Sequence, residues 1–364
     1  MLVHLQAMAI ETIHIDAFLS LAQQHPVFDV RSPAEFEHAH IPQAFSLPLF
    51  TNEERTIVGT HYKQINKQQA IKTALPFFAQ KMVPMIETVE NILKTNNNIQ
   101  STVLVHCWRG GMRSAGVAWL LNLYGFQVYT LQGGYKAYRQ WVLHQFEKKY
   151  VLRVIGGYTG SGKTKILQQL AKQQYPVIDL EGLARHKGSA FGGLDTPAQP
   201  TQEMFENNLA TQLYQLQTKA VKHNATIWLE DESQRIGNIN IPLSFFEQMR
   251  HAPVYFFNIP FEARLDEIML TYGSAPKEKI VNAILRIKKR LGGLATKNAI
   301  NFLLEDNIKD CFAILLQYYD KAYTKGLYNR AHVEQMVTKL DAPSTNASNN
   351  TYLLTTLLKT KQDG

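Results

Sequence analysis

Short apolar runs alternate along the chain with longer stretches of helical periodicity. In the first third, strand-like runs stand on either side of helix-like stretches, as in VFDV (27–30), STVLVHC (101–107), AGVAWLLNLYG (115–125) and QVYTL (127–131). Strands that alternate with helices build a parallel α/β sheet, whose functional residues lie at the carboxyl ends of the strands. The pattern therefore predicts a first α/β domain over residues 1–148.

Inside this first domain, the stretch at about 51–100 departs from the alternation. It has helical periodicity throughout, with two prolines, Pro76 and Pro84, in its middle. Because proline lacks the backbone donor that a helix interior requires, we expect turns at both positions. The stretch is predicted to be a helical insertion.

A second alternating series follows the polar segment 137–150. Its apolar runs are VLRVIGG (151–157), YPVIDL (175–180), ATIWLED (225–231) and APVYFFNI (252–259). A second α/β domain over residues 149–364, with a helical C-terminal part, is therefore predicted. Within that part, DAPSTNASNN (341–350) is expected to be a flexible link before a short terminal helix.

Composition narrows the class of protein. The 364 residues contain 45% hydrophobic and 19% charged residues, which is typical of a soluble globular chain with more than one core. The formal net charge of +8 favours a polyanionic partner such as nucleic acid. There are two cysteines, no stretch resembling a secretory signal and no apolar run of about 18 residues, so we expect a cytoplasmic protein without a membrane span.

The segment HCWRGGMRS (106–114) carries the first candidate chemistry. Cys107 comes directly after a predicted buried strand and shortly before a predicted helix, where loop N–H groups and the helix N-terminus stabilise a thiolate or a bound anion. We therefore interpret Cys107 as a nucleophile; the alternative is a small core residue. His106 is as consistent with packing as with catalysis, and Cys311, in KDCFAILLQYY, is expected to be a buried apolar residue.

The other residues of the loop fit an anion cradle. Gly110 and Gly111 allow the backbone to approach a ligand closely. Arg109 and Arg113 can offer planar donor forks to an oxyanion such as phosphate, selenophosphate or thiosulfate. The catalytic candidates of this domain are thus Cys107, Arg109 and Arg113.

The sequence on both sides of the loop resembles the rhodanese sulfurtransferase domain. The resemblance is carried by DVRSPAEFEHAHIPQA (29–44), the cysteine loop and LQGGYKAYRQW (131–141). It implies the rhodanese fold and a cysteine that accepts a chalcogen and passes it on. Ala39 and Gln43 stand where many rhodaneses have glycine.

The length of the cysteine loop is typical of phosphatases rather than of small rhodaneses. Five residues separate Cys107 from Arg113, where small rhodaneses usually have four, and the spacing is that of a phosphatase signature. Phosphatases of the cell-cycle type share both this spacing and the rhodanese fold. A cysteine phosphatase or a sulfurtransferase joined to a nucleotide-binding module therefore stays open as an alternative.

The second domain begins with a phosphate-binding motif. VLRVIGGYTGSGKTKILQQL (151–170) contains G-x-x-x-x-G-K-T between a strand-like and a helix-like run, the context of a P-loop. In such a loop the backbone N–H groups cradle a diphosphate, the lysine neutralises it and the threonine can bind Mg²⁺. The predicted phosphate-binding residues are Gly157, Gly160, Gly162, Lys163 and Thr164.

Acidic residues follow two of the strand-like runs. Asp179 follows PVI, while Glu230 and Asp231 end ATIWLED, with Glu232 beside them. Together with Thr164 they are the candidate ligands of Mg²⁺; each acid alone could equally be an exposed charge. No residue identifies an adenine pocket, so a P-loop here indicates a phosphorylated ligand without specifying a nucleotide.

A basic segment lies further along, in PKEKIVNAILRIKKRLGGLATK (276–297). An apolar stripe formed by Val281, Ile284, Leu285 and Leu291 predicts a helix, whose cations would share an exposed face. Such a face is either merely solvated or binds RNA or another polyanion. The candidate tRNA-binding residues are Arg286, Lys288, Lys289 and Arg290.

Over nearly its whole length the chain resembles the tRNA 2-selenouridine synthase family. The stretches concerned include TNEERTIVGTHYKQ (51–64), the cysteine loop, GGYTGSGKT, LEGLARHKGSAFGG (180–193), LEDESQRIG (229–237) and KRLGG (289–293). The resemblance implies an enzyme that replaces sulfur by selenium in the wobble 2-thiouridine of tRNA with selenophosphate. It also implies S-geranylation of that base from geranyl diphosphate as the preceding step.

The resemblance further implies a role for each domain. The P-loop would hold the diphosphate of the prenyl donor with Mg²⁺, and Cys107, Arg109 and Arg113 would take part in selenium delivery. A non-catalytic RNA-binding sensor that uses the P-loop as a switch is the alternative from another class.

Overall fold

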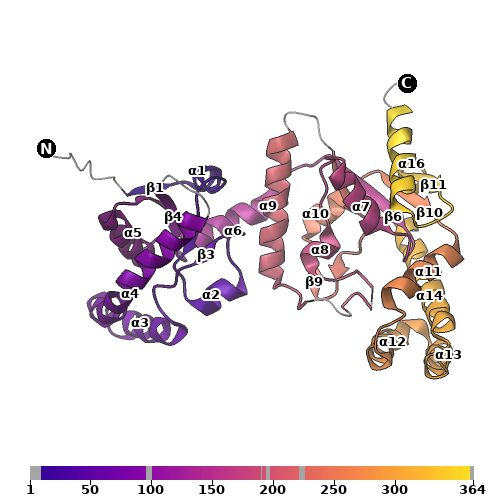
Figure 1. Ribbon diagram of the computed structural model, residues 1–364, viewed down its shortest axis with the longest axis horizontal. Helices are drawn as coiled ribbons and strands as arrows, with labels where there is room; N and C mark the ends of the chain where they lie inside the picture. Colours follow the sequence, from indigo (N-terminus) through magenta and orange to yellow (C-terminus); the bar gives the residue numbers. More distant parts are fainter. Residues whose placement is uncertain (1–9, 96–100, 190, 194–196, 221–225, 361–364) are drawn as a thin grey trace. The chain divides into compact units, whose positions relative to one another are not determined.

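The computed structural model describes residues 10–95, 101–189, 191–193, 197–220 and 226–360. The chain divides into two compact units, Met1–His144 and Gln145–Gly364 (Figure 1). Each unit has its own parallel sheet and its own apolar core.

The first unit is built on a five-stranded parallel sheet in the order β1-β5-β4-β2-β3. Its central strand β4 is fully buried at Val103, Leu104 and Val105, because helices cover both faces of a parallel sheet. The strands are β1 (Glu11–Ile13), β2 (Val27–Asp29), β3 (Phe45–Ser46), β4 (Thr102–His106) and β5 (Gln127–Leu131). The helices are α1 (Ile15–Leu21), α2 (Pro33–His38), α3 (Asn52–Gln64), α4 (Lys67–Thr95), α5 (Met112–Tyr124) and α6 (Gly134–Gln145).

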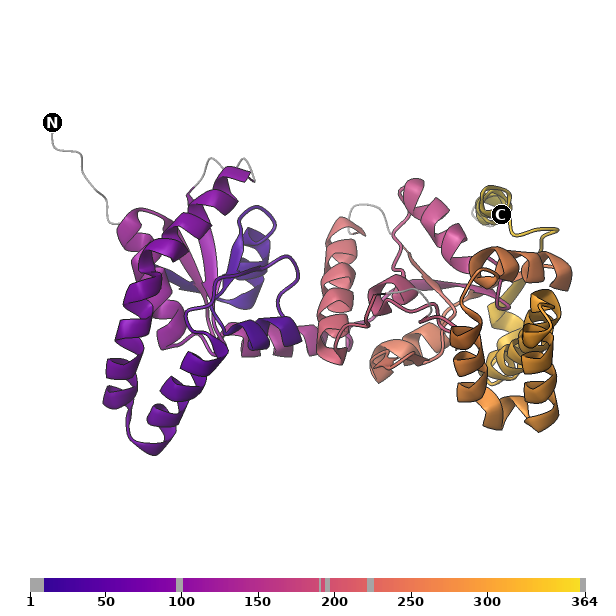
Figure 2. The same ribbon diagram turned by 60° about the horizontal axis from the view of Figure 1, so that its bottom comes forward.

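The insertion predicted at about 51–100 consists of the helices α3 and α4; residues 96–100 lie outside the described chain. Figure 2 shows the two helices as a hairpin that projects beyond the sheet. The prediction of turns at Pro76 and Pro84 is wrong, since both lie inside the 29-residue α4. Buried residues near the C-terminal end of α4, Val89 among them, pack into the core of the first unit, and this packing offsets the backbone hydrogen bonds that the prolines remove.

The second unit carries a four-stranded parallel sheet in the order β11-β10-β6-β7. Its strands are β6 (Leu152–Gly157), β7 (Ile227–Glu230), β10 (Val254–Asn258) and β11 (Val337–Asp341), and a short hairpin joins β8 (Arg235–Ile236) to β9 (Ile239–Asn240). The strand expected at 175–180 is reduced to a single bridge between Val177 and Trp228. Around the sheet lie α7 (Lys163–Lys172), α8 (Leu180–Ala184), α9 (Gln202–Ala220) and α10 (Leu243–Arg250).

The rest of the second unit is mostly helical and has a core of its own around Ile284 and Phe312. It comprises α11 (Phe261–Tyr272), α12 (Lys277–Leu291), α13 (Gly293–Leu304), α14 (Ile308–Tyr328), α15 (Val333–Met336) and α16 (Ala347–Thr360). The flexible link expected at 341–350 is much shorter, because β11 includes Asp341 and α16 begins at Ala347. The predicted fold class, a rhodanese-like α/β domain followed by a P-loop α/β domain with a helical C-terminal part, is confirmed.

Candidate active sites

The cysteine loop joins the carboxyl end of β4 to the N-terminus of α5. Cys107 follows the last residue of the strand and is only 3% exposed. Its Sγ lies 3.2 Å from the hydroxyl oxygen of Ser114, which lies 3.1 Å from the carbonyl oxygen of Gly111, so the single hydroxyl proton can be donated to either. The sulfur therefore lies at the base of the loop, where strand and helix meet.

This environment favours the thiolate of Cys107. Burial by itself raises the pKa of the thiol, but hydrogen bonds from the Ser114 hydroxyl and from the backbone N–H groups of Ser114, Arg109 and Gly111 outweigh it. The net effect is a lowered pKa. Cys311 is the opposite case, since burial without such donors raises its pKa to about 12. Cys107 thus has the character of a nucleophile and Cys311 that of a core residue.

The segment that contains Gly134, Tyr135 and Lys136 packs against the backbone of the cysteine loop. The backbone N–H groups of Tyr135 and Lys136 donate to the carbonyls of Cys107 (2.8 Å) and Trp108 (3.0 Å). Gly134 has a φ of +60°, and a Cβ at this position would collide with the carbonyl of Cys107. Only glycine fits there, which explains the Gly-Gly pair of LQGGYK; the sequence analysis did not assign Gly134 to the site.

The two predicted arginines of the loop have different environments. Arg109 is exposed. Arg113 forms a two-pronged ion pair with Glu35, with nitrogen to oxygen distances of 2.7 and 3.3 Å. Burial alone raises the pKa of Glu35, but Arg113 outweighs it, so the pKa is lowered and the pair is charged. An anion in the loop must therefore compete with Glu35 for Arg113.

Beneath the loop lies a buried ion pair that the sequence analysis missed. Arg31 and Asp29 are 1% and 0% exposed, with Arg31 Nη2 2.6 Å from Asp29 Oδ2. The same nitrogen donates to the carbonyl of Ala39 (2.7 Å), and the guanidinium lies 3.8 Å from the centre of the Tyr135 ring. The pair links the DVRS and QGGYK segments, both of which border the cysteine loop. In the sequence, only the D-x-R pattern after a predicted strand indicated this ion pair.

His106 belongs to this buried layer. Neither of its ring nitrogens has a hydrogen-bond partner among the described residues, although Nε2 lies 3.7 Å from Asp29 Oδ2. Burial lowers the pKa of His106, so the ring is neutral near pH 7. Burial raises and the charges of His106 and Arg31 lower the pKa of Asp29, with a net lowering. Because His106 is neutral at that pH, Arg31 is the partner that keeps Asp29 ionised.

The two departures from the rhodanese glycine pattern have different consequences. Ala39 has a φ of −168°, which is extended backbone open to any residue. Gln43 has a φ of +67°, in the left-handed region that favours glycine. A glycine at position 43 would therefore relieve strain, whereas one at position 39 would not.

In the second unit the P-loop connects β6 to α7. Gly157, Gly160 and Gly162 have φ values of +151°, +82° and +76°, conformations that side chains rarely adopt. Space is equally restrictive, because a Cβ on Gly157 would lie 2.5 Å from Ser161 Oγ. Lys163 Nζ donates to the carbonyl of Gly157 (3.0 Å), so the lysine folds back over the loop. This is the geometry of a diphosphate cradle at a helix N-terminus.

Acidic side chains crowd beside Thr164. Its hydroxyl lies 3.1 Å from a carboxylate oxygen of Glu181 and 3.2 Å from one of Glu230, which also accepts the backbone N–H of Glu181 (2.9 Å). Burial and mutual repulsion raise the pKa of Glu181 and Glu230, and they raise that of Glu232 to about 8. The sequence analysis did not select Glu181, whose only signal was its place in LEGLARHKG.

The structure separates the four candidate metal ligands. Thr164 and Glu230 meet in front of the P-loop. Asp179 instead caps α8 by accepting the N–H of Gly182 (2.6 Å), and Asp231 is held by Arg330 and by the hydroxyl of Tyr323 (2.6 Å).

Within the described parts of the chain, no three His, Cys, Asp or Glu side chains form a metal cage. Mg²⁺ does not need one, since it commonly takes one or two side chains together with phosphate oxygens and water. Burial, and after it the charges of neighbouring acids, raises the pKa values of the clustered carboxyls, and a bound cation would favour their ionised forms. Thr164 and Glu230 therefore fit Mg²⁺, whereas Asp179 and Asp231 are engaged elsewhere.

Comparison with known proteins agrees with this two-site architecture. The family described as "tRNA 2-selenouridine synthase AAA domain" matches residues 150–347, and "Rhodanese-like domain" matches residues 15–140. A protein named tRNA 2-selenouridine synthase from Bdellovibrio bacteriovorus is 34% identical over 90% of this chain and 95% of its own length. The chain belongs to the tRNA 2-selenouridine synthase family.

Other tRNA 2-selenouridine synthases align less completely. The protein of that name from Nitrosomonas eutropha is 38% identical over 68% of this chain, but the alignment spans only 63% of the relative. The one from Sulfurovum sp. is 33% identical over 82% of this chain and 87% of its own length. In the described residues, no helix is both long and apolar enough to cross a membrane.

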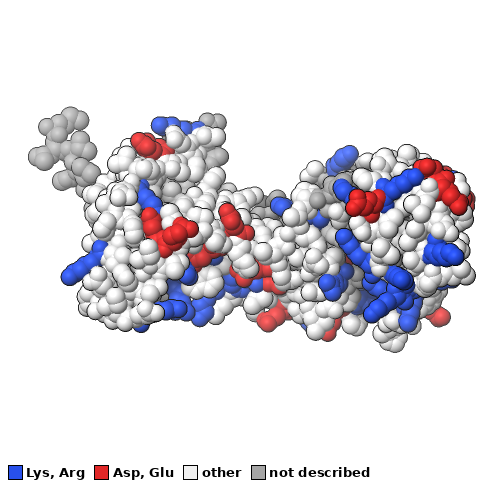
Figure 3. Space-filling view, turned by 90° about the horizontal axis from the view of Figure 1, so that it is seen from below, with Lys and Arg blue, Asp and Glu red and all other residues white. Residues whose placement is uncertain are grey.

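For a member of the tRNA 2-selenouridine synthase family, the basic helix α12 is the candidate tRNA surface. The four predicted residues, Arg286, Lys288, Lys289 and Arg290, are all exposed. Figure 3 shows Lys and Arg side chains gathered on the face of the second unit where α12 lies. The predicted apolar stripe needs one correction: Leu285 is 47% exposed, and the helix packs through Ile280, Ala283, Ile284 and Ile287.

Proposed function

We propose that the protein converts the wobble 2-thiouridine of tRNA to 2-selenouridine with selenophosphate, after S-geranylation from geranyl diphosphate. The observation that carries the proposal is the presence of two different anion cradles in a chain of this family. One has a stabilised thiolate at its base, and the other has the lysine and glycines of a P-loop. A reaction that uses a selenophosphate and a prenyl diphosphate needs one site of each kind.

The P-loop unit would perform geranylation. Its backbone N–H groups and Lys163 bind the diphosphate, while the sulfur of the base attacks the first carbon of the geranyl group. A carbon–sulfur bond forms, the carbon–oxygen bond breaks, diphosphate leaves and the base releases its N3 proton. Mg²⁺ at Thr164 and Glu230 would supply neutralisation of the diphosphate charge.

The cysteine loop would perform the selenium step. Its N–H groups and Arg109 hold the phosphoryl group of selenophosphate, and the Cys107 thiolate attacks the phosphorus. A sulfur–phosphorus bond forms as the phosphorus–selenium bond breaks. The released selenide adds to C2 of the geranylated base and expels geranylthiol, and water then hydrolyses phosphocysteine to phosphate. The phosphatase-like spacing of the loop suits this phosphoryl transfer.

The test is a cross of two variants against two substrates, followed by mass analysis of the nucleosides. Lys163→Ala is expected to lose geranylation of a 2-thiouridine anticodon stem-loop but to selenate a stem-loop that is already geranylated. Cys107→Ser is expected to do the reverse. Cys311→Ser, at the buried cysteine of α14, is the matched control and should keep both steps.

Two outcomes contradict the proposal. The wild-type chain could leave 2-thiouridine unmodified in the presence of both co-substrates. Alternatively, it could release phosphate from an aryl phosphate through Cys107 without modifying tRNA, which would favour the phosphatase interpretation.

A further inference from the structure

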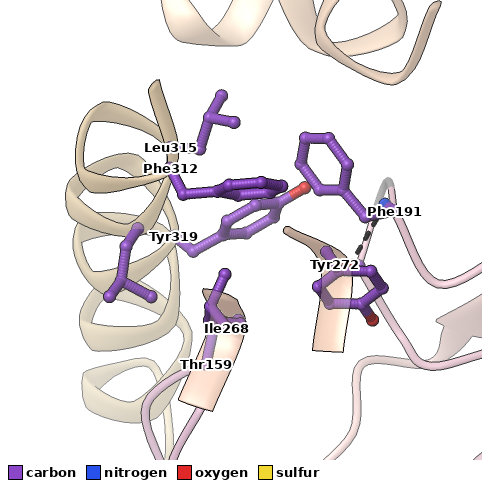
Figure 4. A pocket seen from close by; sticks show the side chains of 9 residues that line it. Thr159, Phe191, Ile268, Tyr272, Phe312, Leu315 and Tyr319 are labelled. Carbon is purple, nitrogen blue, oxygen red and sulfur yellow. Dashed lines mark hydrogen bonds between the residues drawn. The ribbon is translucent and has the colours of Figure 1, made fainter. Parts of the chain in front are cut away.

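An apolar pocket opens beside the P-loop within the second unit (Figure 4). Thr159 of the P-loop lies on its wall, with Ile268 and Tyr272 from α11 and Phe312 and Tyr319 from α14. We propose that this pocket binds the hydrocarbon chain of the prenyl diphosphate and that Phe191 sets the length of chain it accepts. The inference rests on the proposed function and adds to it the residues that select the prenyl group.

The pocket is in direct contact with the diphosphate cradle. Thr159 lies between the first two glycines of the motif, and a Cβ on Gly160 would come within 3.1 Å of the side chain of Ile268. The diphosphate and the first carbon of its organic group are covalently joined. A ligand held by the loop therefore has its hydrocarbon part next to the pocket lining, where burial of apolar surface favours it.

The lining is unusually aromatic. The ring centres of Phe191 and Phe312 are 5.6 Å apart, and Tyr272 stacks on Phe312 at 6.3 Å. A prenyl diphosphate develops positive charge on its allylic carbons as the carbon–oxygen bond breaks. Faces of aromatic rings attract such charge, so the lining suits an ionising prenyl group better than it suits a saturated chain.

The buried side chain of Phe191 forms part of the pocket wall. It is 3% exposed, and its ring meets the rings of Tyr272, Phe312 and Tyr319. The space that remains is about 10 Å³, room for roughly one water molecule. A hydrocarbon chain therefore enters only when Phe191 moves aside.

Phe191 has the local structure for such a movement. It stands on a loop after α8, and its N–H donates to the hydroxyl of Ser189 (3.2 Å). It is held there by one turn and by its ring contacts, whereas Ile268 and Phe312 are fixed on helices. The depth available to the chain thus depends on the size of residue 191.

The experiment compares prenyl diphosphates of five, ten and fifteen carbons as donors to a 2-thiouridine stem-loop. Phe191→Ala is expected to raise the ratio of kcat/KM for farnesyl over geranyl diphosphate by about tenfold or more. Phe191→Trp enlarges the loop residue that limits the depth of the pocket and is expected to lower kcat/KM for geranyl diphosphate by more than about tenfold, while the five-carbon donor is affected less. Leu270→Trp, on the same helix as Ile268 but 83% exposed, is the control and should leave the donor preference unchanged.

A binding measurement separates this inference from the proposed function. Calorimetry with the inert analogue geranyl thiolodiphosphate and with inorganic diphosphate is expected to show tighter binding of the analogue, by about tenfold or more, and loss of that difference in Phe191→Trp. Equal affinity of the wild-type chain for both ligands would contradict the proposed role of the pocket in binding the prenyl chain, whether or not tRNA is modified. Tighter binding of the analogue, in a chain that does not prenylate tRNA, would support the prenyl-binding role of the pocket and contradict the proposed function.

Discussion

The cysteine loop and the P-loop are both candidate anion-binding loops, but the charged side chains around them are arranged differently. Each joins a buried parallel strand to the N-terminus of a helix. Under the cysteine loop the buried charges are already paired, Arg31 with Asp29. In front of the P-loop, Glu181, Glu230 and Glu232 repel one another.

The difference indicates how each site depends on its ligand. The first site carries its own anion, the thiolate of Cys107, and its supporting charges are neutralised within the fold. The second gathers acidic side chains beside Lys163 and Thr164, whose charge a divalent cation would balance when they ionise. We therefore expect the cysteine loop to be preorganised and the P-loop region to gain order and stability from its ligands.

The strongest test of preorganisation is removal of one buried charge. Asp29→Asn leaves Arg31 buried without its counter-ion and is expected to cost about 3–5 kcal/mol of unfolding free energy in the first unit. Hydrogen exchange of the β4 amides in urea measures the loss. The exposed pair of Asp266 with Lys309 provides the control, because Asp266→Asn should change stability by less than about 1 kcal/mol. Equal effects of the two substitutions would contradict a special role for the buried pair.

The acidic cluster predicts that the stability of the second unit depends on pH. The ordinary glutamate value is 4.5, and the folded pKa of Glu232 is about 8, so the folded state binds more protons than the unfolded state between these values. The unfolding free energy therefore falls as pH rises from 4.5 to 8, by about 1.4 kcal/mol per pH unit for each proton involved. Hydrogen exchange of β6 across this range measures the slope.

Ligands and substitutions sharpen the same prediction. Mg²⁺ with diphosphate at about one hundred times its Kd should stabilise the second unit by about 2.7 kcal/mol and leave the first unit unchanged. Glu232→Gln should flatten the pH slope, whereas Glu305→Gln, at an exposed position, should not. A slope that persists in Glu232→Gln would assign the titration to other groups.

The thiolate of Cys107 gives a smaller effect. Because its pKa is lowered, the rate of alkylation by iodoacetamide should reach half of its maximum at a lower pH than for an ordinary thiol. Ser114→Ala removes the hydroxyl beside the sulfur and is expected to raise that midpoint, because one of the groups that stabilise the thiolate is lost. Cys107→Ser should abolish the labelling, since Cys311 is buried with a raised pKa. An unchanged midpoint in Ser114→Ala would remove this hydroxyl from the site.

The smallest effect concerns the surface of α12. The double substitution Arg286→Glu with Arg290→Glu should reduce the log-log salt dependence of tRNA binding by about 0.7 to 0.9 for each tRNA phosphate that the helix no longer neutralises. Lys309→Glu on α14, where the lysine is already paired with Asp266, serves as the control. Unchanged affinity and slope in the double variant would exclude this helix from the tRNA surface.

Short-range signals made much of the two sites predictable. G-x-x-x-x-G-K-T after a strand placed Lys163 and Thr164, and H-C-x-x-G-x-x-R-S placed Cys107 at the end of β4. Their conformations follow from residues close in sequence, because glycines and helix N-termini act locally. The prolines of α4 mark the limit of this reasoning, since packing of the whole helix outweighed their local preference.

By itself, the sequence determined the fold class and the basic helix, and it predicted a thiol nucleophile and a diphosphate cradle. Only the tertiary structure decided which charges meet: Arg113 pairs with Glu35, Asp231 pairs with Arg330, and Glu181 joins Glu230 at Thr164. It also placed Phe191 among rings from two distant helices. Such partners lie far apart in the chain, and side-chain electrostatics and packing depend on distance in space, which no local pattern records.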